Sequence, residues 1–271
     1  MYRRKPAVAG SFYPSNSHRL GEMIDSYLEE AQGGAGAGIV GLISPHAGYV
    51  YSGPVAAYSY RRLDADVNLA VVLAPSHRAR FNGAALLDEG AYETPLGDVE
   101  IDGAVCGKLK GLNYFGTLKE AHELEHSLEV QIPFLQKVLK NFTLVPIIVG
   151  TVDLDICRMI GEGIQSALSG EPRKFIIVMS TDLSHYHSYS AAQTMDKRFI
   201  DALSTFDEKE VGDVIASGKA EACGEGPVLA GMVLCKRLGA RKVEILKYAN
   251  SGDTAGGKDQ VVGYLAAAFV K

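Results

Sequence analysis

The sequence predicts one α/β domain with a central, mainly parallel or mixed sheet flanked by helices. Short apolar runs rich in β-branched residues alternate with longer segments of helical periodicity, which is the order typical of an α/β sheet. The 271 residues, 47% hydrophobic and 22% charged, are enough for one substantial core. The chain shows no repeat of fixed period and no linker long enough to separate two domains, so we expect a single domain over residues 1–271.

The apolar runs and the helical periodicity place the individual elements. Strands are expected at residues 38–43, 69–74, 83–88, 142–149, 174–180, 243–248 and 260–269. Helices are expected at residues 17–31, 53–63, 102–110, 125–140, 153–168, 190–204, 207–217 and 227–238. Pro133 lies inside the pattern at 125–140, so we expect a kink or a late start in that helix.

Composition excludes several classes of partner. The net charge is -5 and no dense run of Lys or Arg is present, which argues against nucleic acid or an acidic membrane surface as the main partner. The longest apolar runs are far shorter than the roughly 20 residues of a membrane span. The apolar stretch behind the basic N-terminus stops at Ser11, too early for a signal-peptide core.

The four cysteines form no CxxC pair and no disulfide framework, so we expect a cytoplasmic protein.

The glycine-rich stretch at residues 32–38 contains a formal GxGxxG match at Gly36, Gly38 and Gly41. That motif binds a dinucleotide when it follows a strand and opens a helix. Here the glycines run into a strand instead, so nucleotide binding is not expected.

Histidines follow the ends of the strands expected at 38–43, 69–74 and 174–180. They are His46, His77 and His185. Parallel strands present their carboxyl ends at one edge of a sheet, where ligand sites of open α/β folds lie. Pro45 and Pro75 stiffen the turns before the first two histidines, which suits metal ligands or catalytic bases. We therefore expect the histidines to converge in one cleft.

Asp182 precedes His185 by three residues. In a helical turn the two side chains would share a face, and the carboxylate would hold the imidazole tautomer or raise its basicity. The same pair would act as base and orienter in a hydrolase with Ser180 or Ser184 as the nucleophile. No GxSxG motif supports that third, weaker alternative.

His122 and His126 are spaced i, i+4 and the segment reads His-Glu-Leu-Glu-His, which matches the HExxH pattern of zinc peptidases. The segment is charged at nearly every position and has no clear third-ligand signature. We keep the peptidase as a minor alternative.

Cys223 differs from the other cysteines. Cys106, Cys157 and Cys235 occupy apolar positions of helical patterns, where a thiol is usually a small core side chain. Cys223 lies in a glycine-rich turn before the helix expected at 227–238, where a helix N-terminus would favour the thiolate.

Several long motifs together resemble the Memo family. They are PHAGYVYSGPVAA from Pro45, APSHR from Ala74, YETPLGDVEID from Tyr92, EHSLEVQIPFL from Glu125, STDLSHY from Ser180 and ACGEGP from Ala222. They occur in the order expected of that family and span essentially the whole chain. The family in turn resembles the class III extradiol ring-cleavage dioxygenases of the LigB type, which implies an α/β domain of that kind.

The resemblance also implies a metal site. In the dioxygenases two histidines and a glutamate hold non-haem Fe(II). Carried over by motif, His46 and His77 are the histidine ligands, and Cys223 takes the third position in place of the carboxylate. The resemblance makes Fe(II) the first expectation, and because thiolate is softer than carboxylate, Cu or Zn are alternatives. The resemblance further implies that His185, assisted by Asp182, acts as acid and base.

His126 matches a further histidine that lines the same cleft in the family, which implies a substrate-facing or structural role. The leading expectation is therefore a metal-binding protein, as an iron-dependent dioxygenase or another redox enzyme acting on a small substrate. The alternative is a non-catalytic protein that uses the same cleft for an anionic phosphopeptide or small ligand. In that case His77, Arg78 and Arg80 would be the anion contacts.

Overall fold

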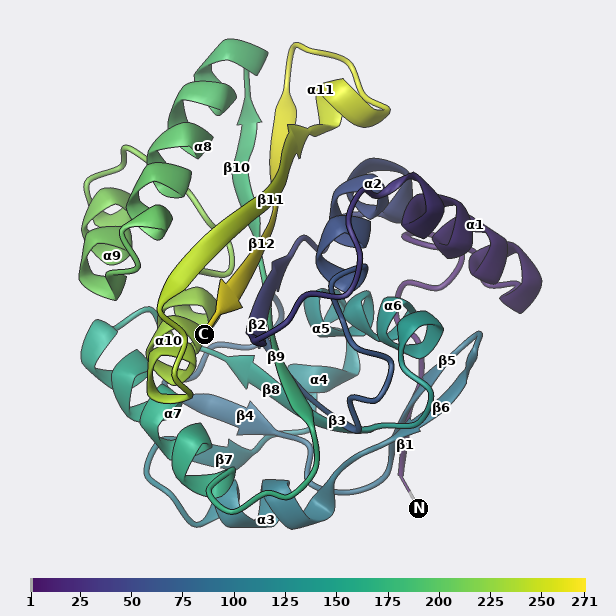
Figure 1. Ribbon diagram of the computed structural model, residues 1–271, viewed down its shortest axis with the longest axis vertical. Coiled ribbons are helices and arrows are strands. Elements are labelled where there is room, and N and C mark those ends of the chain that lie inside the picture. Colours follow the sequence, from purple (N-terminus) through teal and green to yellow (C-terminus); the bar gives the residue numbers. More distant parts are fainter. Residues whose placement is uncertain (1) are drawn as a thin grey trace.

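The computed structural model describes residues 2–271 and is organised around a nine-stranded sheet (Figure 1). Its strands are β2 (Ile39–Ser44), β3 (Leu69–Pro75), β4 (Ala84–Leu86), β7 (Phe115–Thr117), β8 (Thr143–Val149), β9 (Phe175–Ser180), β10 (Asp182–His187), β11 (Lys242–Asn250) and β12 (Val261–Val270). Their order is β10-β12-β2-β9-β3-β8-β4-β7, and β11 pairs with β12. A small sheet of order β1-β5-β6 lies beside it, formed by β1 (Arg3–Arg4), β5 (Ala91–Thr94) and β6 (Gly97–Glu100).

The middle of the large sheet is parallel and its flanks are antiparallel. β2, β9, β3 and β8 run in one direction, with Leu42 opposite Val178 and Leu73 opposite Met179. β12 runs antiparallel to β2, and β4 runs antiparallel to β8. The carboxyl ends of the four parallel strands therefore open at one edge, where the fold leaves room for loops that carry function.

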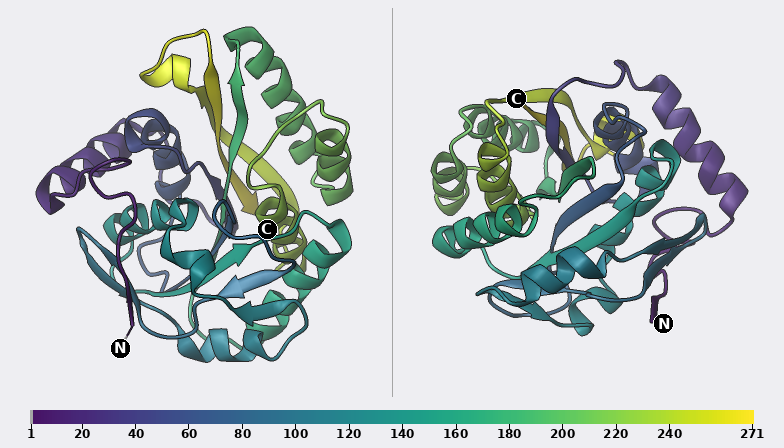
Figure 2. Two further views of the ribbon diagram at one scale, coloured as in Figure 1. Left: turned by 180° about the vertical axis from the view of Figure 1, so that it is seen from behind. Right: turned by 60° about the horizontal axis from the view of Figure 1, so that its bottom comes forward.

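Helices cover both faces of this sheet. They are α1 (Ser17–Glu30), α2 (Tyr49–Tyr60), α3 (Gly103–Lys110), α4 (Glu120–Glu123), α5 (His126–Glu129), α6 (Gln131–Val138), α7 (Leu154–Ala167), α8 (Tyr189–Ser204), α9 (Glu208–Ala216), α10 (Glu225–Arg237) and α11 (Ser251–Thr254). α10 contacts β2, β3 and β9 on one face, with α7 packed against it. α2 contacts β2 and β12 on the other face, with α1 outside it and α6 alongside (Figures 1 and 2).

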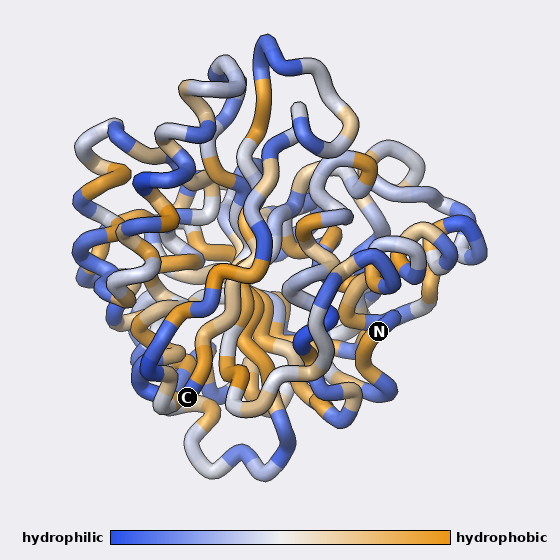
Figure 3. Tube along the Cα trace, turned by 45° about the horizontal axis from the view of Figure 1, so that its top comes forward, coloured by the Kyte–Doolittle hydropathy of each residue, from blue (hydrophilic) through white to orange (hydrophobic). Residues whose placement is uncertain are grey.

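The core follows the parallel strands. Every residue of β3 is buried, and the strands at the centre of the molecule are apolar whereas polar residues gather on the outer turns (Figure 3). Both faces of these strands lie under helices, which explains their continuous apolar sequences. Within residues 2–271 no helix combines the length and apolarity that crossing a bilayer requires.

These observations confirm the predicted α/β fold class with a mixed sheet flanked by helices. Each expected strand and helix has a counterpart, with ends shifted by a few residues. The helix expected at 125–140 is divided at Val130 into α5 and α6, and Pro133 lies in the first turn of α6, where its missing N–H costs no helical hydrogen bond. The glycines of the GxGxxG match precede or enter β2, so that match opens no helix.

The local structure around His185 differs from what the sequence suggested. The segment from Asp182 to His185 is part of strand β10 rather than a helical turn, so the spacing does not place the two side chains on one helical face. β10 pairs with β12 through register shifts on either side of His185. The histidine therefore lies within an antiparallel strand rather than just after the end of β9.

Candidate metal centre

His46 lies two residues beyond the end of β2, and its side chain is 2% exposed. The buried carboxylate of Asp182 accepts a hydrogen bond from the His46 backbone N–H, with 2.7 Å between N and Oδ1. The ring is held from behind by Ser180, whose Oγ is 2.8 Å from Nδ1. This arrangement leaves Nε2 pointing away from Ser180, 3.1 Å from Cys223 Sγ and 4.0 Å from Asp182 Oδ2.

His77 lies two residues beyond the end of β3 and is fixed by one carboxylate. Glu125 Oε2 accepts a hydrogen bond from the His77 backbone N at 2.6 Å, and Oε1 lies 2.9 Å from Nδ1 of the ring. Burial would raise the pKa of Glu125, but the hydrogen bond and charge of His77 and the backbone amides of Ser127 and His77 outweigh it and lower that pKa to about 2. Glu125 is therefore an anion that leaves Nε2 of His77 free to bind.

His126 opens helix α5 and completes a cluster of three rings. Its ring stacks on His77 with centroids 4.9 Å apart, and it meets His46 edge-on at 5.5 Å. Phe12 contacts it from the other side, again edge-on, with centroids 4.9 Å apart. The N-terminal segment thus forms one wall of the cluster.

The donor atoms of these three histidines can hold one metal ion. One ring nitrogen from each of His46, His77 and His126 lies within 4.8 Å of the others. Burial lowers the pKa of His46 well below its usual range, and the neighbouring His77, His126 and His185 lower it further. Burial also lowers the pKa of His126, to about 4, although Glu125 opposes this shift. Neutral imidazoles with carboxylate or hydroxyl partners behind them are what a transition metal requires, so the residues present fit such an ion.

Cys223 lies beside this cluster, with its Sγ 3.1 Å from Nε2 of His46. The backbone N–H of Asp182 donates to the same sulfur at 3.3 Å. Burial raises the pKa of the thiol, and the charge of Asp182 raises it further, so the thiol is protonated at neutral pH. Cys106, Cys157 and Cys235 are fully buried in the core, as the sequence predicted.

Asp182 contacts the cluster, and His185 lies within electrostatic range of it, but both are held by different contacts from those expected. Asp182 accepts a hydrogen bond from the His46 backbone N–H. Burial raises the pKa of its carboxyl to about 7, although hydrogen bonds from the backbone amides of His46 and Ala47 act to lower it. His185 is held through its backbone N–H by Glu221, which also bonds to the ring of His187. The charge of His185 is close enough to disfavour protonation of His46.

His122 belongs to the core rather than to the metal centre. It is fully buried, with Nδ1 2.7 Å from the Tyr92 hydroxyl and Nε2 3.1 Å from the Ala85 carbonyl. Both ring nitrogens are therefore occupied, and α4 and α5 are separate helices. The zinc-peptidase alternative fails for this reason.

The hydrolase alternative fails as well. Ser180 and Ser184 are both 0% exposed, so neither hydroxyl is placed to attack a substrate. Ser180 is engaged instead with the His46 ring and the Ser127 carbonyl.

Residues that sequence reasoning missed include Glu125, Phe12 and Gln131. Glu125 lies in a segment that is charged at nearly every position, yet its side chain is completely buried against His77. The signal that could have revealed it is its position directly before His126, at the N-cap of α5, where its carboxylate also accepts from the Ser127 amide.

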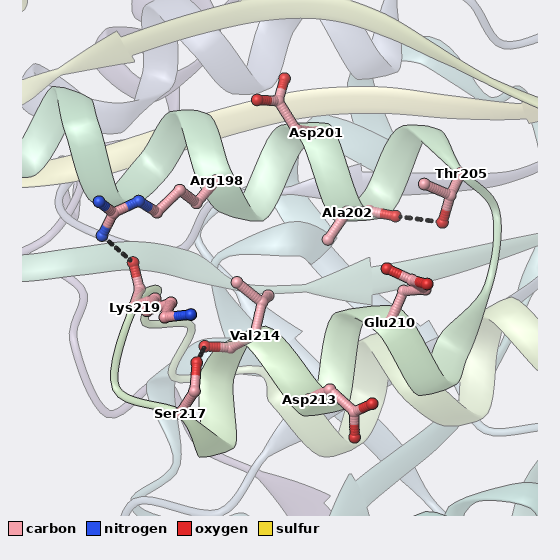
Figure 4. A pocket seen from close by; sticks show the side chains of 9 residues that line it. All are labelled: Arg198, Asp201, Ala202, Thr205, Glu210, Asp213, Val214, Ser217 and Lys219. Atoms are coloured by element: carbon pink, nitrogen blue, oxygen red, sulfur yellow. Dashed lines mark hydrogen bonds between the residues drawn. The ribbon is translucent and has the colours of Figure 1, made fainter.

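A separate cavity of about 550 Å³ lies between α8 and α9, away from the histidine cluster (Figure 4). Arg198 and Lys219 line it together with the acidic residues Asp201, Glu210 and Asp213. The cationic and anionic side chains share the same groove, and none of the histidines reaches it.

Taken together, the fold and the site define an α/β protein with a histidine cluster, able to hold a metal ion, at the carboxyl edge of its parallel strands. The family model described as Memo-like protein matches residues 4–268, and the chain belongs to that family. A MEMO1 family protein from Nitrosopumilus maritimus is 38% identical, over 98% of this chain and 99% of the relative. MEMO1 family proteins from Methanopyrus kandleri and Thermoplasma acidophilum are 37% and 38% identical over 98% and 97% of this chain, and over 98% and 97% of their own lengths.

A solved structure shares the fold. An uncharacterized protein from Escherichia coli K12 matches with a TM-score of 0.59 over 85% of this chain and 99% of its own. Its sequence identity is 15%, so the likeness concerns the fold alone.

Proposed function

We propose that this protein holds one transition-metal ion in the histidine cluster and uses it for oxygenation or other redox chemistry on a small substrate. The observation that carries the proposal is the approach of three imidazole donors within 4.8 Å, two of them on turns just beyond parallel strands and the third at the start of α5. Imidazole suits Fe, Cu and Zn. Fe(II) is our first choice because of the likeness to non-haem iron dioxygenases, with Cu or Zn as alternatives.

His46 and His77 are the two ligands common to both donor sets that we consider. His126 supplies the third donor without rearrangement, because its ring nitrogen already lies within the 4.8 Å group. Cys223 is the other candidate, since its sulfur is 3.1 Å from His46 Nε2. To bind, the thiol must lose its proton, which its raised pKa disfavours until a cation is present.

The remaining residues would handle protons and substrate. A bound iron ion would supply the capacity to react with dioxygen or exchange electrons. Asp182, with a pKa raised to about 7, can accept or release a proton at Oδ2 near neutral pH. His185 is the second candidate base, and Phe12 shields one side of His126 from water.

Anaerobic metal titration tests the proposal. Purified protein is loaded with Fe(II), Zn(II) or Co(II) and the bound metal is quantified after desalting. We expect one ion per chain, and loss of binding in the His46→Ala and His77→Ala variants. Absence of stoichiometric metal in the wild type would overturn the proposal.

Cobalt distinguishes the two possible third donors. A Co(II)–thiolate bond gives an intense charge-transfer band, which disappears in Cys223→Ser if the cysteine binds. If His126 is the third donor instead, the band is absent from the wild type and His126→Ala loses affinity. A catechol-cleavage assay on the iron-loaded wild type then tests dioxygenase activity.

A second candidate function is binding of an anionic ligand without catalysis, such as a phosphorylated peptide. Arg78 and Arg80 are exposed beside His77, and the positive charge of Arg78 contributes to lowering the pKa of His126. Arg readily pairs with phosphate or carboxylate oxygens. Phenyl phosphate that binds metal-free His46→Ala protein and not Arg78→Ala would favour this candidate.

We also infer a reducing compartment such as the cytoplasm. All four cysteines are free thiols, and three of them are buried apart from one another in the core. Mass mapping of alkylated cysteines in protein quenched inside cells would test this inference.

A further inference from the structure

A buried polar network behind His46 connects the turns that carry the histidine cluster. Gln131, at the start of α6, is 1% exposed and reaches the Pro45 carbonyl before His46. It also reaches Ser180, which ends β9 and contacts both the Ser127 carbonyl and the His46 ring. The network therefore joins the turn of His46 to helix α5, which carries His126, and the Ser127 hydroxyl extends it to the Pro75 carbonyl before His77.

The orientation of the Gln131 amide follows from the Pro45 carbonyl. A backbone carbonyl can only accept, so the amide atom 3.0 Å from it must be the nitrogen, Nε2. The amide oxygen then faces the Tyr60 hydroxyl, which donates to it at 2.6 Å. Nε2 has a second hydrogen, and Ser180 Oγ lies 2.8 Å away to accept it.

The Ser180 hydroxyl proton is placed by the same reasoning. Ser127 O lies 2.7 Å from Ser180 Oγ, and two oxygens approach this closely only with a proton between them. Because the carbonyl has none to give, the serine must donate to it. The Ser180 Oγ can then only accept hydrogen bonds, one from Gln131 and one from His46.

The geometry points to Ser180, supported by Gln131, as the positioning residue that holds His46 in the tautomer with its proton on Nδ1. His46 Nδ1, 2.8 Å from a hydroxyl oxygen whose own proton is committed elsewhere, has to be the donor. A neutral imidazole carries one proton, so Nε2 presents a free lone pair. The thiol of Cys223, 3.1 Å away, donates to that lone pair when no metal is bound.

The Nδ1–H tautomer prepares His46 to bind a metal ion, an inference that rests on the proposed function. A histidine in the other tautomer must first move its proton before Nε2 can bind a cation, whereas His46 is ready to bind. Hydrogen-bond partners of metal-binding histidines typically change affinity by 10–100-fold when they are removed. We therefore expect Ser180 to affect affinity without touching the metal.

Nuclear magnetic resonance of the metal-free protein tests the tautomer directly. In protein labelled with ¹⁵N-histidine, long-range proton–nitrogen correlation distinguishes a protonated from an unprotonated ring nitrogen at His46. We expect Nδ1–H to predominate by about tenfold in the wild type, from one net hydrogen bond in a buried site. Predominance of Nε2–H in the wild type would overturn the inference, with no variant needed.

Variants test whether Ser180 is responsible. Ser180→Ala should leave both tautomers populated and weaken Zn(II) binding about tenfold, measured by competition with a chromophoric chelator. Ser180→Thr, which retains the hydroxyl, should keep both the Nδ1–H tautomer of His46 and the Zn(II) affinity of the wild type. The matched control is Ser184→Ala, which removes an equally buried serine on β10 outside this network and should change neither.

The outcomes separate this inference from the proposed function. A wild type that shows Nδ1–H but binds none of Fe(II), Zn(II) and Co(II) overturns the proposed metal function and retains the assignment of Ser180. An unchanged tautomer in folded Ser180→Ala overturns the positioning role. If the tautomer shifts while Zn(II) affinity does not, the role of Ser180 in metal capture is refuted.

Discussion

Glu125 holds His77 at two points, accepting from the backbone N–H through Oε2 and contacting ring Nδ1 through Oε1. The carboxylate thus sets both the path of the turn after β3 and the rotation of the imidazole. Because the side chain of Glu125 is 0% exposed, water cannot replace either contact. The loss of either of these intramolecular hydrogen bonds is therefore costly.

Replacing Glu125 by Gln should weaken metal binding. The amide has the same shape but only one acceptor oxygen, so its NH2 group must face one of the two N–H donors of His77 or the Ser127 amide. We expect Zn(II) affinity to fall about 10–100-fold. Glu123→Gln changes an exposed glutamate two residues away and is the control. Equal affinities in the two variants would contradict the prediction.

The low pKa of Glu125 predicts that the stability of the fold depends on pH. The pKa of Glu125 is about 2 in the folded protein, below its usual value, so its carboxylate stabilises the fold above the unfolded pKa. That contribution falls as pH drops toward the folded pKa, by about 2 kcal/mol between neutral pH and pH 3. Urea unfolding of metal-free protein at pH 7 and pH 3 measures it.

Comparison with Glu125→Gln isolates this carboxylate from the others. The difference in unfolding free energy between wild type and variant should shrink by about 2 kcal/mol as pH falls from 7 to 3. A difference that stays constant over this range would show that the carboxyl titrates normally in the folded protein.

A buried ion pair between Arg4 and Glu129 ties the N-terminal segment to the metal centre. Both side chains are completely buried, and Glu129 also accepts from the amides of Ala7 and Val8. Removing one partner leaves a buried charge without its counterion, so Arg4→Met or Glu129→Gln should each cost about 3–5 kcal/mol of unfolding free energy.

The double variant should be less unstable than the sum of the single variants, because it removes the charge as well as its partner. Urea unfolding of the wild type, both single variants and the double variant completes the cycle. Additive losses would mean that the two side chains stabilise the fold independently.

The sequence predicted the parts of the fold and site that depend on local pattern. The runs at β2 and β3 are buried on both faces and form continuous apolar segments, and Pro45 just after β2 and Pro75 at the end of β3 place His46 and His77. β10 was missed because Asp182, Ser184 and His185 form no apolar pattern. It is a strand because the antiparallel β12 supplies its hydrogen bonds across two register shifts.

The charged segment around His126 shows why the rest could not be predicted. Glu125 and Glu129 are fully buried, and their partners Arg4 and His77 lie far away in the sequence. Sequence reasoning treats such charges as solvated, because burial without a partner is prohibitive. Only the tertiary structure shows that the partners are present.

Two helical glycines with opposite surroundings give a test of the packing between α7 and α10. A Cβ on Gly161 of α7 would lie 2.5 Å from the Ala230 carbonyl oxygen of α10, so the helices would have to separate. We expect Gly161→Ala to lose about 1–3 kcal/mol from overpacking, despite the better helix propensity of alanine. Gly107, exposed on α3, has open space where its Cβ would be, so Gly107→Ala should gain about 0.5–1 kcal/mol. Urea midpoints at unchanged m-values measure both, and a shift of the same sign in the two variants would show that helix propensity, rather than backbone contact, governs these positions.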